Sequence, residues 1–396
     1  MLKSRGPPRH RIRQRPSFAG PLVSTPEWRR DFRLRAPLTP PREAMAFELL
    51  AWIVLLLLLL RVLSKLTDIY TLLRPDAPAP PSLLMMPQLM LRKGMLTLYG
   101  AFFLVMSKDK VSKTQLARAP DADDIAGKID REVRIIFIRH GESMWNLVFN
   151  RGFGPSFLVR LVKAVLYEAY LLPFSDSCFL DSPLSDLGLE QCSELQEFLR
   201  KPCLPGSSAQ MRADFEALVA GEGSSVIVSS QLRRAVGTAA IALSDRLKRT
   251  NEPILLHSSC QEISRNFDTM AISEPGAGPQ LRGTAELERK QPYDGTANKG
   301  NKTLGFRGLH RLQSFAAWAC ERPERTIVVA GHSLWFRSFF QLYLPRSEEH
   351  TAKKRKIMNC GAIGFSLQTG RASDGSLRHR IDPKSIETVY GGFATK

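Results

Sequence analysis

Short apolar runs recur along the last two-thirds of the chain. Residues 133–138 are β-branched or aromatic and show little alternation between apolar and polar positions. This pattern is typical of a central strand covered on both faces. Residues 225–229, 326–330 and 362–367 also have the character of strands. Because the carboxyl ends of parallel strands share one edge of a sheet, we expect the polar residues that follow the first three runs to lie close together.

The longest apolar stretch lies nearer the start of the chain. Residues 49–60 carry no charge and end in six leucines. As a helix, residues 47–63 would extend about 25 Å, close to the hydrocarbon thickness of a bilayer. We expect residues 45–66 to form a single-pass membrane anchor. A cleaved signal sequence and an organellar presequence are the alternatives.

Two further apolar segments predict helices of other kinds. Residues 83–106 are interrupted by a proline and two basic residues, so we expect them to pack on the anchor or on the membrane surface rather than to span. Within residues 154–174, apolar side chains recur at helical spacing, which predicts an amphipathic helix. The favoured interpretation is a helix packed on the core. The alternatives are a lid over the active site or a contact with the membrane.

Composition agrees with one catalytic domain behind an N-terminal extension. Of the 396 residues, 43% are hydrophobic, which supports a sizeable core, and the formal net charge is +18. Residues 1–44 hold eleven basic residues, three acidic residues and many prolines, which indicates a disordered or targeting segment. The basic run at residues 353–356 is expected to be a solvated loop before a strand, with a nuclear signal or an anion-binding patch as the alternatives. No nucleic-acid-binding motif accompanies it, so no nucleic-acid partner is expected.

These patterns predict four regions along the chain. The basic segment at residues 1–44 precedes the anchor at residues 45–66, which is followed by a linker with a second apolar segment at residues 67–130. The catalytic domain is expected at residues 131–396, with an insertion at about residues 152–180.

The orientation of the anchor depends on where translation starts. From Met1, the positive-inside rule keeps the N-terminus cytosolic and exports the catalytic domain, whereas from Met45 the catalytic domain stays in the cytosol. Asn301 begins the only glycosylation sequon, and a glycan there would report an exported domain. The six cysteines show neither C-x-x-C spacing nor a metal-binding pattern, so they do not identify the compartment.

The residues after the predicted strands suit phosphoryl transfer. The motifs are Arg139-His140-Gly141-Glu142-Ser143, then Ser230 and Arg234, then Gly331-His332-Ser333. A phosphomonoester carries nearly two negative charges, which repel an anionic nucleophile but not a neutral imidazole. We expect His140 to attack phosphorus through one ring nitrogen while its other nitrogen donates to a backbone carbonyl.

The remaining roles follow from side-chain chemistry. Arg139 and Arg234 offer planar, bidentate donors to phosphoryl oxygens. His332 is expected to be a further phosphate ligand that stabilises the transition state. Glu262 is the candidate acid that protonates the departing oxygen and then the base that activates water. Since cationic side chains supply the positive charge, no metal or other cofactor is expected.

These motifs resemble those of the histidine phosphatase superfamily, which includes the cofactor-dependent phosphoglycerate mutases. The similarity covers about residues 131–391. It includes the first motif extended by Trp145-Asn146, the segment from Asp181 to Gln191, the arginine motif from Ser230 to Thr238, and the late histidine motif. The resemblance implies a three-layer α/β/α sandwich around a mostly parallel sheet. It also implies that His140 is phosphorylated, that Glu262 donates the proton, and that phosphate is bound by Arg139, Arg234, His332 and Asn146.

The similarity to the glycolytic mutases weakens in two places. Residues 150–155 only faintly resemble their "N-R-x-x-G-W" segment, and residues 262–266 depart from their "E-R-H-Y-G" pattern. A mutase must keep water from the phosphohistidine, whereas a phosphatase must admit it. The sequence therefore favours a phosphatase. The alternatives are a phosphoglycerate mutase and a membrane-anchored scaffold that binds phosphate without turnover.

Other residues near the motifs are candidates for secondary roles. Substrate-binding candidates are Glu142, Ser143, Arg265 and Arg337. Asp268 and Glu142 are alternatives to Glu262 as the acid, and Arg233 is interpreted as a solvated neighbour of Arg234. The expected substrate is a phosphorylated small molecule or a phosphoprotein. The sequence fixes neither its identity nor the oligomeric state.

Overall fold

A computed structural model describes the chain at residues 42–73, 81–221, 224–281 and 293–395. The prediction of a disordered or targeting segment falls almost wholly on residues 1–41, outside the described part. The chain divides into two compact units, Met1–Leu56 and Leu57–Lys396. The entire described sheet belongs to the second unit.

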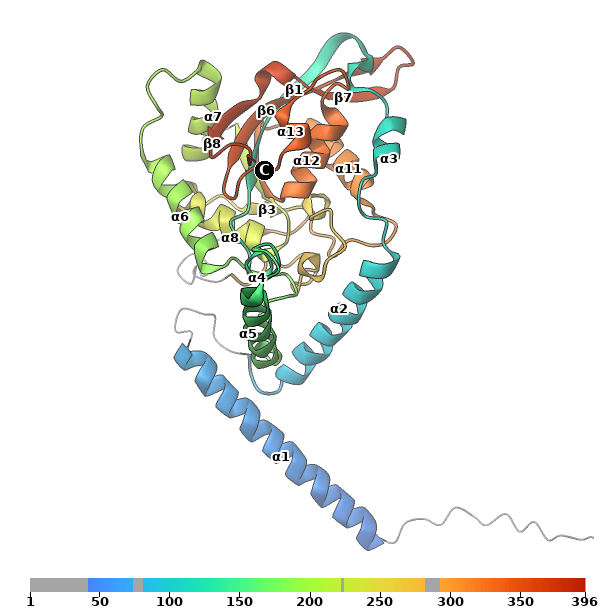
Figure 1. The fold of residues 1–396 in the computed structure, drawn as a ribbon, viewed down its shortest axis with the longest axis vertical. Helices are drawn as coiled ribbons and strands as arrows, with labels where there is room; N and C mark the ends of the chain where they lie inside the picture. Colours follow the sequence, from blue (N-terminus) through green and yellow to red (C-terminus); the bar gives the residue numbers. More distant parts are fainter. Residues whose placement is uncertain (1–41, 74–80, 222–223, 282–292, 396) are drawn as a thin grey trace, which may run out of the picture. The chain divides into compact units, whose positions relative to one another are not determined.

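A mixed sheet forms the centre of the second unit (Figure 1). Its strand order is β4-β3-β2-β5-β1-β6-β7, with β8 paired to β6. Strands β4, β3, β2, β5 and β1 are parallel, whereas β6 is antiparallel to β1, β7 and β8. In the described residues the strands are Ile125–Arg139 (β1), Ser225–Ser229 (β2), Ile254–Leu256 (β3), Tyr293–Asp294 (β4), Thr326–Gly331 (β5), Ala362–Ala372 (β6), Leu377–Ile381 (β7) and Glu387–Tyr390 (β8).

The strands predicted from the apolar runs are confirmed. They are β1, β2, β5 and β6, and β5 lies between β1 and β2. The register pairs Arg139 with Gly331 and Ser229 with Ala330. These three parallel strands therefore end level with one another. The residues that follow them share one edge of the sheet.

Helices cover both faces of the sheet, which confirms the predicted three-layer α/β/α arrangement (Figure 1). On β1, Ile136 and Ile138 face one helical layer, and Ile135 and Phe137 face the other. The first layer contains α6 (Asp186–Arg200), α7 (Ala209–Val219), α8 (Arg233–Ala242) and α9 (Ser244–Thr250); the second contains α11 (Gly308–Glu321) and α12 (Ser333–Tyr343), followed by α13 (Thr351–Lys354).

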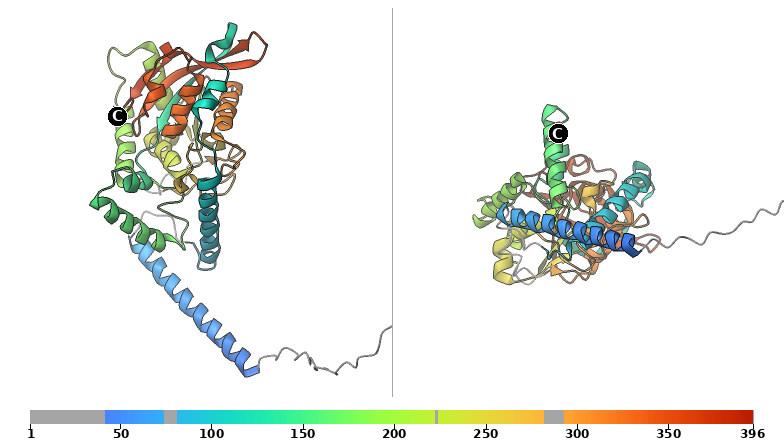
Figure 2. Two further views of the ribbon diagram at one scale, coloured as in Figure 1. Left: turned by 45° about the vertical axis from the view of Figure 1, so that its right-hand side comes forward. Right: turned by 90° about the horizontal axis from the view of Figure 1, so that it is seen from below.

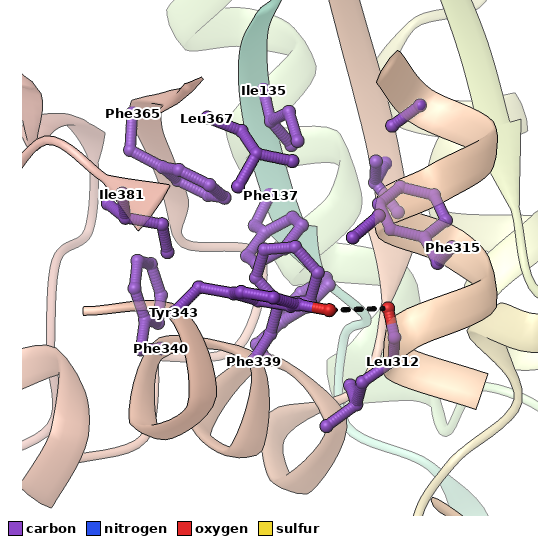
Figure 3. Close-up of a cluster of buried hydrophobic side chains, with 14 of the residues drawn as sticks. Ile135, Phe137, Leu312, Phe315, Phe339, Phe340, Tyr343, Phe365, Leu367 and Ile381 are labelled. Carbon is purple, nitrogen blue, oxygen red and sulfur yellow. Dashed lines mark hydrogen bonds between the residues drawn. The ribbon is translucent and has the colours of Figure 1, made fainter. Parts of the chain in front are cut away.

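An aromatic cluster fixes β1 against the second layer (Figure 3). The ring of Phe137 stacks on Phe336 at 4.1 Å and meets the edges of Phe339 and Phe365 at 5.4 and 4.7 Å. Aromatic pairs of this kind add about 0.5–1.5 kcal/mol each beyond the burial of their area. Phe137 precedes Arg139 on β1, and α12 begins directly after His332. The cluster therefore positions both the Arg139-His140 motif at the end of β1 and His332 at the start of α12.

The second apolar segment forms α2 (Met86–Met106) and packs on the catalytic unit with one face. Phe103 is fully buried against Leu180, Met270 and Ile272, and the Tyr99 hydroxyl donates to the Lys302 carbonyl at 2.9 Å. The opposite face exposes a helical stripe of Leu91, Met95, Leu98, Phe102 and Val105. The segment predicted to be part of a linker is thus largely integral to the catalytic unit.

A buried ion cluster extends this unit further along the predicted linker. The Asp109 side chain, which is 1% exposed, lies 3.0 Å from Lys302 Nζ and 2.7 Å from Arg311 Nη1. Both cations are fully buried. Since an unpaired buried charge is costly, the folded unit requires residues well before 131. A short helix, α3 (Lys113–Arg118), connects the cluster to β1.

The insertion contains the predicted amphipathic helix, α5 (Pro155–Leu171), and a short helix, α4 (Met144–Phe149), precedes it. The expectation that α5 packs on the core is wrong. Only Ala164 and Leu171 of this helix are buried. One side of the helix is buried or half-buried along its length, whereas most of its apolar stripe stays uncovered. It lies at the end of the catalytic unit away from the β6–β7 hairpin (Figures 1 and 2).

Candidate active site

His140 follows the last residue of β1 and is held by two backbone contacts. Its amide donates to the Gly331 carbonyl at 3.0 Å, and its ring Nδ1 donates to the Gly141 carbonyl at 2.6 Å. The second contact leaves the Nε2 lone pair available. The residue is 4% exposed, and burial, reinforced by Arg234 and Arg139, lowers its pKa well below 6.5. The ring is therefore neutral at neutral pH, as a nucleophile must be.

Gly141 is needed because two backbones meet at the turn. A Cβ on Gly141 would lie 2.6 Å from the carbonyl oxygen of Gly188 in α6. Its amide also donates to the Thr238 hydroxyl at 3.1 Å. The backbone at Gly141 thus lies close to the backbone of Gly188 in α6. That contact fixes the position of the neighbouring histidine.

A cavity of about 160 Å³ opens at the carboxyl edge of the parallel strands. Five of the predicted site residues line it: Arg139, His140, Asn146, Arg234 and Glu262. The lining is completed by Trp145, Asn150, Ser264, Asn266, Asp268, Ser333, Leu334 and Lys356. The polar groups from separate strands and loops therefore converge, as the strand pattern predicted.

Two arginines bring positive charge to this cavity. Arg139 Nη1 donates to the Ile357 carbonyl at 2.7 Å. Arg234 is 2% exposed; it donates through Nη1 to the Asp268 carbonyl at 2.6 Å, and its Nη2 lies 3.1 Å from the Asp268 carboxylate. Within the described part of the chain, the buried Nε atoms of both arginines have no hydrogen-bond partner. Buried donors left without partners are costly, and an anion would satisfy them.

His332 lies beside the proposed nucleophile. The two imidazole centroids are 5.1 Å apart. The Ser230 hydroxyl is hydrogen-bonded to Nε2 of His332 at 2.6 Å, while the buried Nδ1 has no partner among the described residues. Burial, followed by the charge of Arg234, lowers the pKa of His332 well below 6.5. Ser230 thus holds one nitrogen of a neutral ring, while the other is buried, and His332 is not among the residues that line the cavity.

Glu262 is fixed at the N-terminus of α12. Its Oε1 accepts from the amides of Trp335 at 3.0 Å and Ile263 at 2.9 Å. Burial raises its pKa above 4.5, although Arg234 acts in the opposite direction. Burial likewise raises the pKa of Asp268 above 3.8. Both carboxyls line the cavity, so geometry admits either as the acid.

Four substrate-binding candidates do not line the cavity. Glu142 is ion-paired with Arg151 at 2.8 Å and accepts from the Ser185 hydroxyl at 2.8 Å. Ser143 is fully buried and caps α4. Arg265 is exposed, and Arg337 is half-buried away from the lining. These positions give no support to a direct substrate contact, and Glu142 is not placed to act as the acid.

The interpretation of Arg233 as a solvated residue is wrong. Its side chain is 5% exposed and forms an ion pair with Asp176. Its amide donates to the Asp181 carboxylate at 2.8 Å, and its Nε donates to the Asp181 carbonyl at 2.8 Å. The segment beginning at Asp181 therefore holds the start of α8, from which Arg234 reaches the cavity.

Sequence reasoning missed several residues of the cavity wall. The clearest is Lys356, because the whole run at residues 353–356 was expected to be a solvated loop. Lys353 and Lys354 end α13, whereas Lys356 lines the cavity. The missed signal was position: the run lies shortly before β6, the strand paired with β1. Asn150, Ser264 and Asn266 carried no comparable signal.

Comparisons with known proteins identify similar solved structures only. No family model matches the chain, and no curated protein matches it. A mycobacterial glucosyl-3-phosphoglycerate phosphatase is 17% identical, with 66% of this chain and 100% of that chain covered and a TM-score of 0.31. A phosphoglycerate mutase from Bacillus anthracis is 14% identical, with 64% and 92% covered and a TM-score of 0.32.

A phosphoserine phosphatase mutant from Entamoeba histolytica, solved with phosphoserine, is also similar. It is 15% identical, with 66% of this chain and 97% of that chain covered and a TM-score of 0.29. The matched structures are thus phosphatases and a mutase, the kinds of enzyme that the sequence motifs resemble. Because the TM-scores lie near 0.3, this likeness adds nothing on chemistry to what the site's own residues provide.

Proposed function

We propose that the chain is a phosphomonoester hydrolase that works through a phosphohistidine on His140. The observation that carries the proposal is the state of this imidazole at the cavity. Its Nδ1 is engaged by a carbonyl, its Nε2 is free, and it is neutral because it is buried. Two arginines with unsatisfied donors lie at the same cavity. This combination suits attack on a dianionic phosphoryl group.

The reaction has two displacements at phosphorus. In the first, Nε2 of His140 forms the N–P bond while the P–O bond to the leaving group breaks, and Glu262 gives its proton to the departing oxygen. In the second, water attacks phosphorus, the Glu262 carboxylate takes a proton from it, and the N–P bond breaks. Phosphate leaves and the enzyme is restored. Arg139, Arg234 and His332 hold the phosphoryl oxygens in both steps.

The substrate is proposed to be a small, polar phosphomonoester. Beyond the phosphate-binding groups, the cavity wall presents the side chains of Asn146, Asn150, Ser264, Asn266 and Lys356. Hydroxyl or carboxylate groups on the substrate would find partners there, whereas a purely apolar group would not.

The test uses the full chain in detergent micelles. Wild type and His140→Ala are compared for phosphate release from a panel of phosphomonoesters, and acid-labile, base-stable phosphate is trapped on the protein. We expect release and a trapped phosphoryl group in wild type only. Isomerisation of 3-phosphoglycerate with a bisphosphate primer, without release, would identify a mutase. Phosphate binding without either reaction would identify a scaffold.

We also propose that the enzyme is tethered to a membrane by residues 45–66. Two described helices, Phe47–Leu73 and Met86–Met106, are long and apolar enough to cross a bilayer. The first is 6% buried over its apolar window. The second packs against the catalytic unit through Tyr99 and Phe103, so only the first is proposed to span. Resistance to carbonate extraction, lost when residues 45–66 are deleted, tests the anchor.

A further inference from the structure

The apolar stripe of α5 has no covering element in the described part of the chain. It consists of Leu158, Val159, Val162, Val165 and Leu166, here called the α5 face. These side chains are 49–66% exposed. Contiguous apolar surfaces of this kind mark interaction sites in soluble or peripheral proteins. We propose that the α5 face docks on the surface of an anionic lipid bilayer.

The first argument for a bilayer is the attachment of α5 to the end of α1 (Arg42–Leu73). Leu63 and Tyr70, in the last turns of α1, are buried in one cluster with Leu171 and Phe174. Tyr70 stacks on Phe174 with ring centroids 4.3 Å apart. The C-terminal end of α5 is therefore fixed to Leu63, near the end of the proposed anchor, and to Tyr70, which follows the anchor. A helix so placed lies where the chain emerges from the bilayer.

The second argument is the distribution of charge on α5. Lys163 is exposed within the apolar face. The one acidic residue of the helix, Glu168, points into the protein, where it accepts from the Cys178 amide at 2.6 Å and the Ser177 hydroxyl at 2.8 Å. At a bilayer, Lys163 extends from the apolar boundary to the lipid phosphates. Against a second copy of the same face, the same lysine would be buried beside its own counterpart.

Docking would also set the position of the cavity. Phe157, in the first turns of α5, meets Phe149 of α4 with ring centroids 6.1 Å apart, and Phe149 packs on Trp145 at 4.3 Å. Trp145 and Asn150 line the cavity. With α5 immersed about 5–10 Å into the headgroup boundary, the cavity wall that these rings join to α5 would lie near the headgroup layer. Docking does not depend on the proposed hydrolysis, but its first argument rests on the proposed membrane tether.

The test measures the depth of α5 in vesicles of phosphatidylcholine and phosphatidylserine that carry the reconstituted full chain. A Cys203→Ser background leaves five cysteines, all buried. Single cysteines replace Leu158, Val162 or Leu166 and carry an environment-sensitive fluorophore. The control is Ser373→Cys, exposed on the β6–β7 hairpin at the far end of the unit (Figure 1). Lipids with a nitroxide near the headgroup act as quencher.

We expect all three α5 positions to be quenched about twofold or more relative to Ser373→Cys. The variant Val162→Glu with Leu166→Glu should abolish quenching at Leu158 and leave hydrolysis of a soluble phosphomonoester unchanged, because both side chains are exposed. Quenching equal to that of the control at every α5 position would overturn the proposal. So would disulfide cross-linking of two copies through Val162→Cys without quenching, which would identify a dimer face.

Discussion

Burial shifts the pKa values of the histidines and the carboxyls of the cavity in opposite directions. It disfavours the charged form of each group, so it lowers the pKa values of His140 and His332 and raises those of Glu262 and Asp268. With ordinary values of 6.5 and 4.5, a neutral histidine and a protonated glutamic acid would rarely coexist. The shifts make that pair common, and it is the pair that the first displacement requires.

The pH dependence of kcat/KM follows from these directions. Activity should rise as the pH increases through the His140 pKa, which lies below 6.5, because the neutral ring is the nucleophile. It should fall as the pH increases through the Glu262 pKa, which lies above 4.5, because the protonated acid is lost. Initial rates on an alkyl phosphate from pH 4 to pH 9 measure both limbs. An alkaline limb that persists in Glu262→Gln would exclude Glu262 as its source.

The choice of leaving group distinguishes the two candidate acids, Glu262 and Asp268. Glu262→Gln should lower kcat/KM for an alkyl phosphate by about 10²–10⁴-fold. It should cost much less with p-nitrophenyl phosphate, whose phenolate leaves without protonation. Asp268→Asn is the matched variant, since it also removes one carboxyl from the cavity. If Asp268→Asn alone showed this substrate-dependent loss, Asp268 would be the acid.

The turn after the nucleophile should tolerate no side chain. Gly141→Ala would place a Cβ 2.6 Å from the Gly188 carbonyl, so His140 must move or the fold must loosen. We expect a loss of activity and a lower melting temperature. Gly94→Ala is the control, because that helical position has no atom within 4 Å of the added Cβ and alanine favours a helix by about 1 kcal/mol. Equal effects of the two changes would contradict this account of the turn.

At the scale of elements, α2 and the segment after it belong to the catalytic unit. The Asp109 carboxylate neutralises two cations that are both fully buried, Lys302 and Arg311. Lys302 Nζ also donates to the Glu262 carbonyl at 2.7 Å. The cluster therefore supports the loop that carries the proposed acid. It links an element far upstream in the sequence to the catalytic cavity.

Breaking this ion cluster should strongly lower the free energy of unfolding. Asp109→Asn should lower the free energy of unfolding by about 3–5 kcal/mol, because it leaves buried cations without a full counter-charge. Asp245→Asn breaks the more exposed pair with Arg200 and should leave the free energy of unfolding almost unchanged. Denaturant titration of the full chain in micelles measures both. A chain that begins at residue 120 lacks Asp109 and should be destabilised to a similar extent.

At the scale of the whole molecule, the hydrogen bonds of Asn301 lead us to expect that its glycosylation sequon stays unmodified. Asn301 accepts from the Ala271 amide at 2.7 Å and from Gln261 Nε2 at 3.0 Å, and it donates to the Ala271 carbonyl at 2.9 Å. A glycan on this nitrogen would break the last bond and crowd the loop. Active enzyme purified from a secretory host should therefore lack a glycan at Asn301, as checked by intact mass. Full occupancy in active protein would contradict the hydrogen bonding described.

The sequence by itself determined the parts of the molecule that local pattern controls. Apolar runs of β-branched residues specified β1, β2, β5 and β6, since such runs stay in water only at high cost. The sequence also predicted that Arg139, His140 and Arg234 lie close together, because the parallel strands that precede them end at one edge, and all three line one cavity. Helical periodicity likewise predicted α5 as a helix.

Only the tertiary structure decided which surfaces those elements cover. Periodicity shows that α5 has an apolar face, but whether other elements bury it depends on contacts between distant segments. Arg233 looked like a surface residue, yet Asp176 and Asp181 enclose it. Asp109 had no local signal, because its partners come from elsewhere in the chain, and Lys356 had only its position before β6. Burial, ion pairing and shifted pKa values arise from non-local packing.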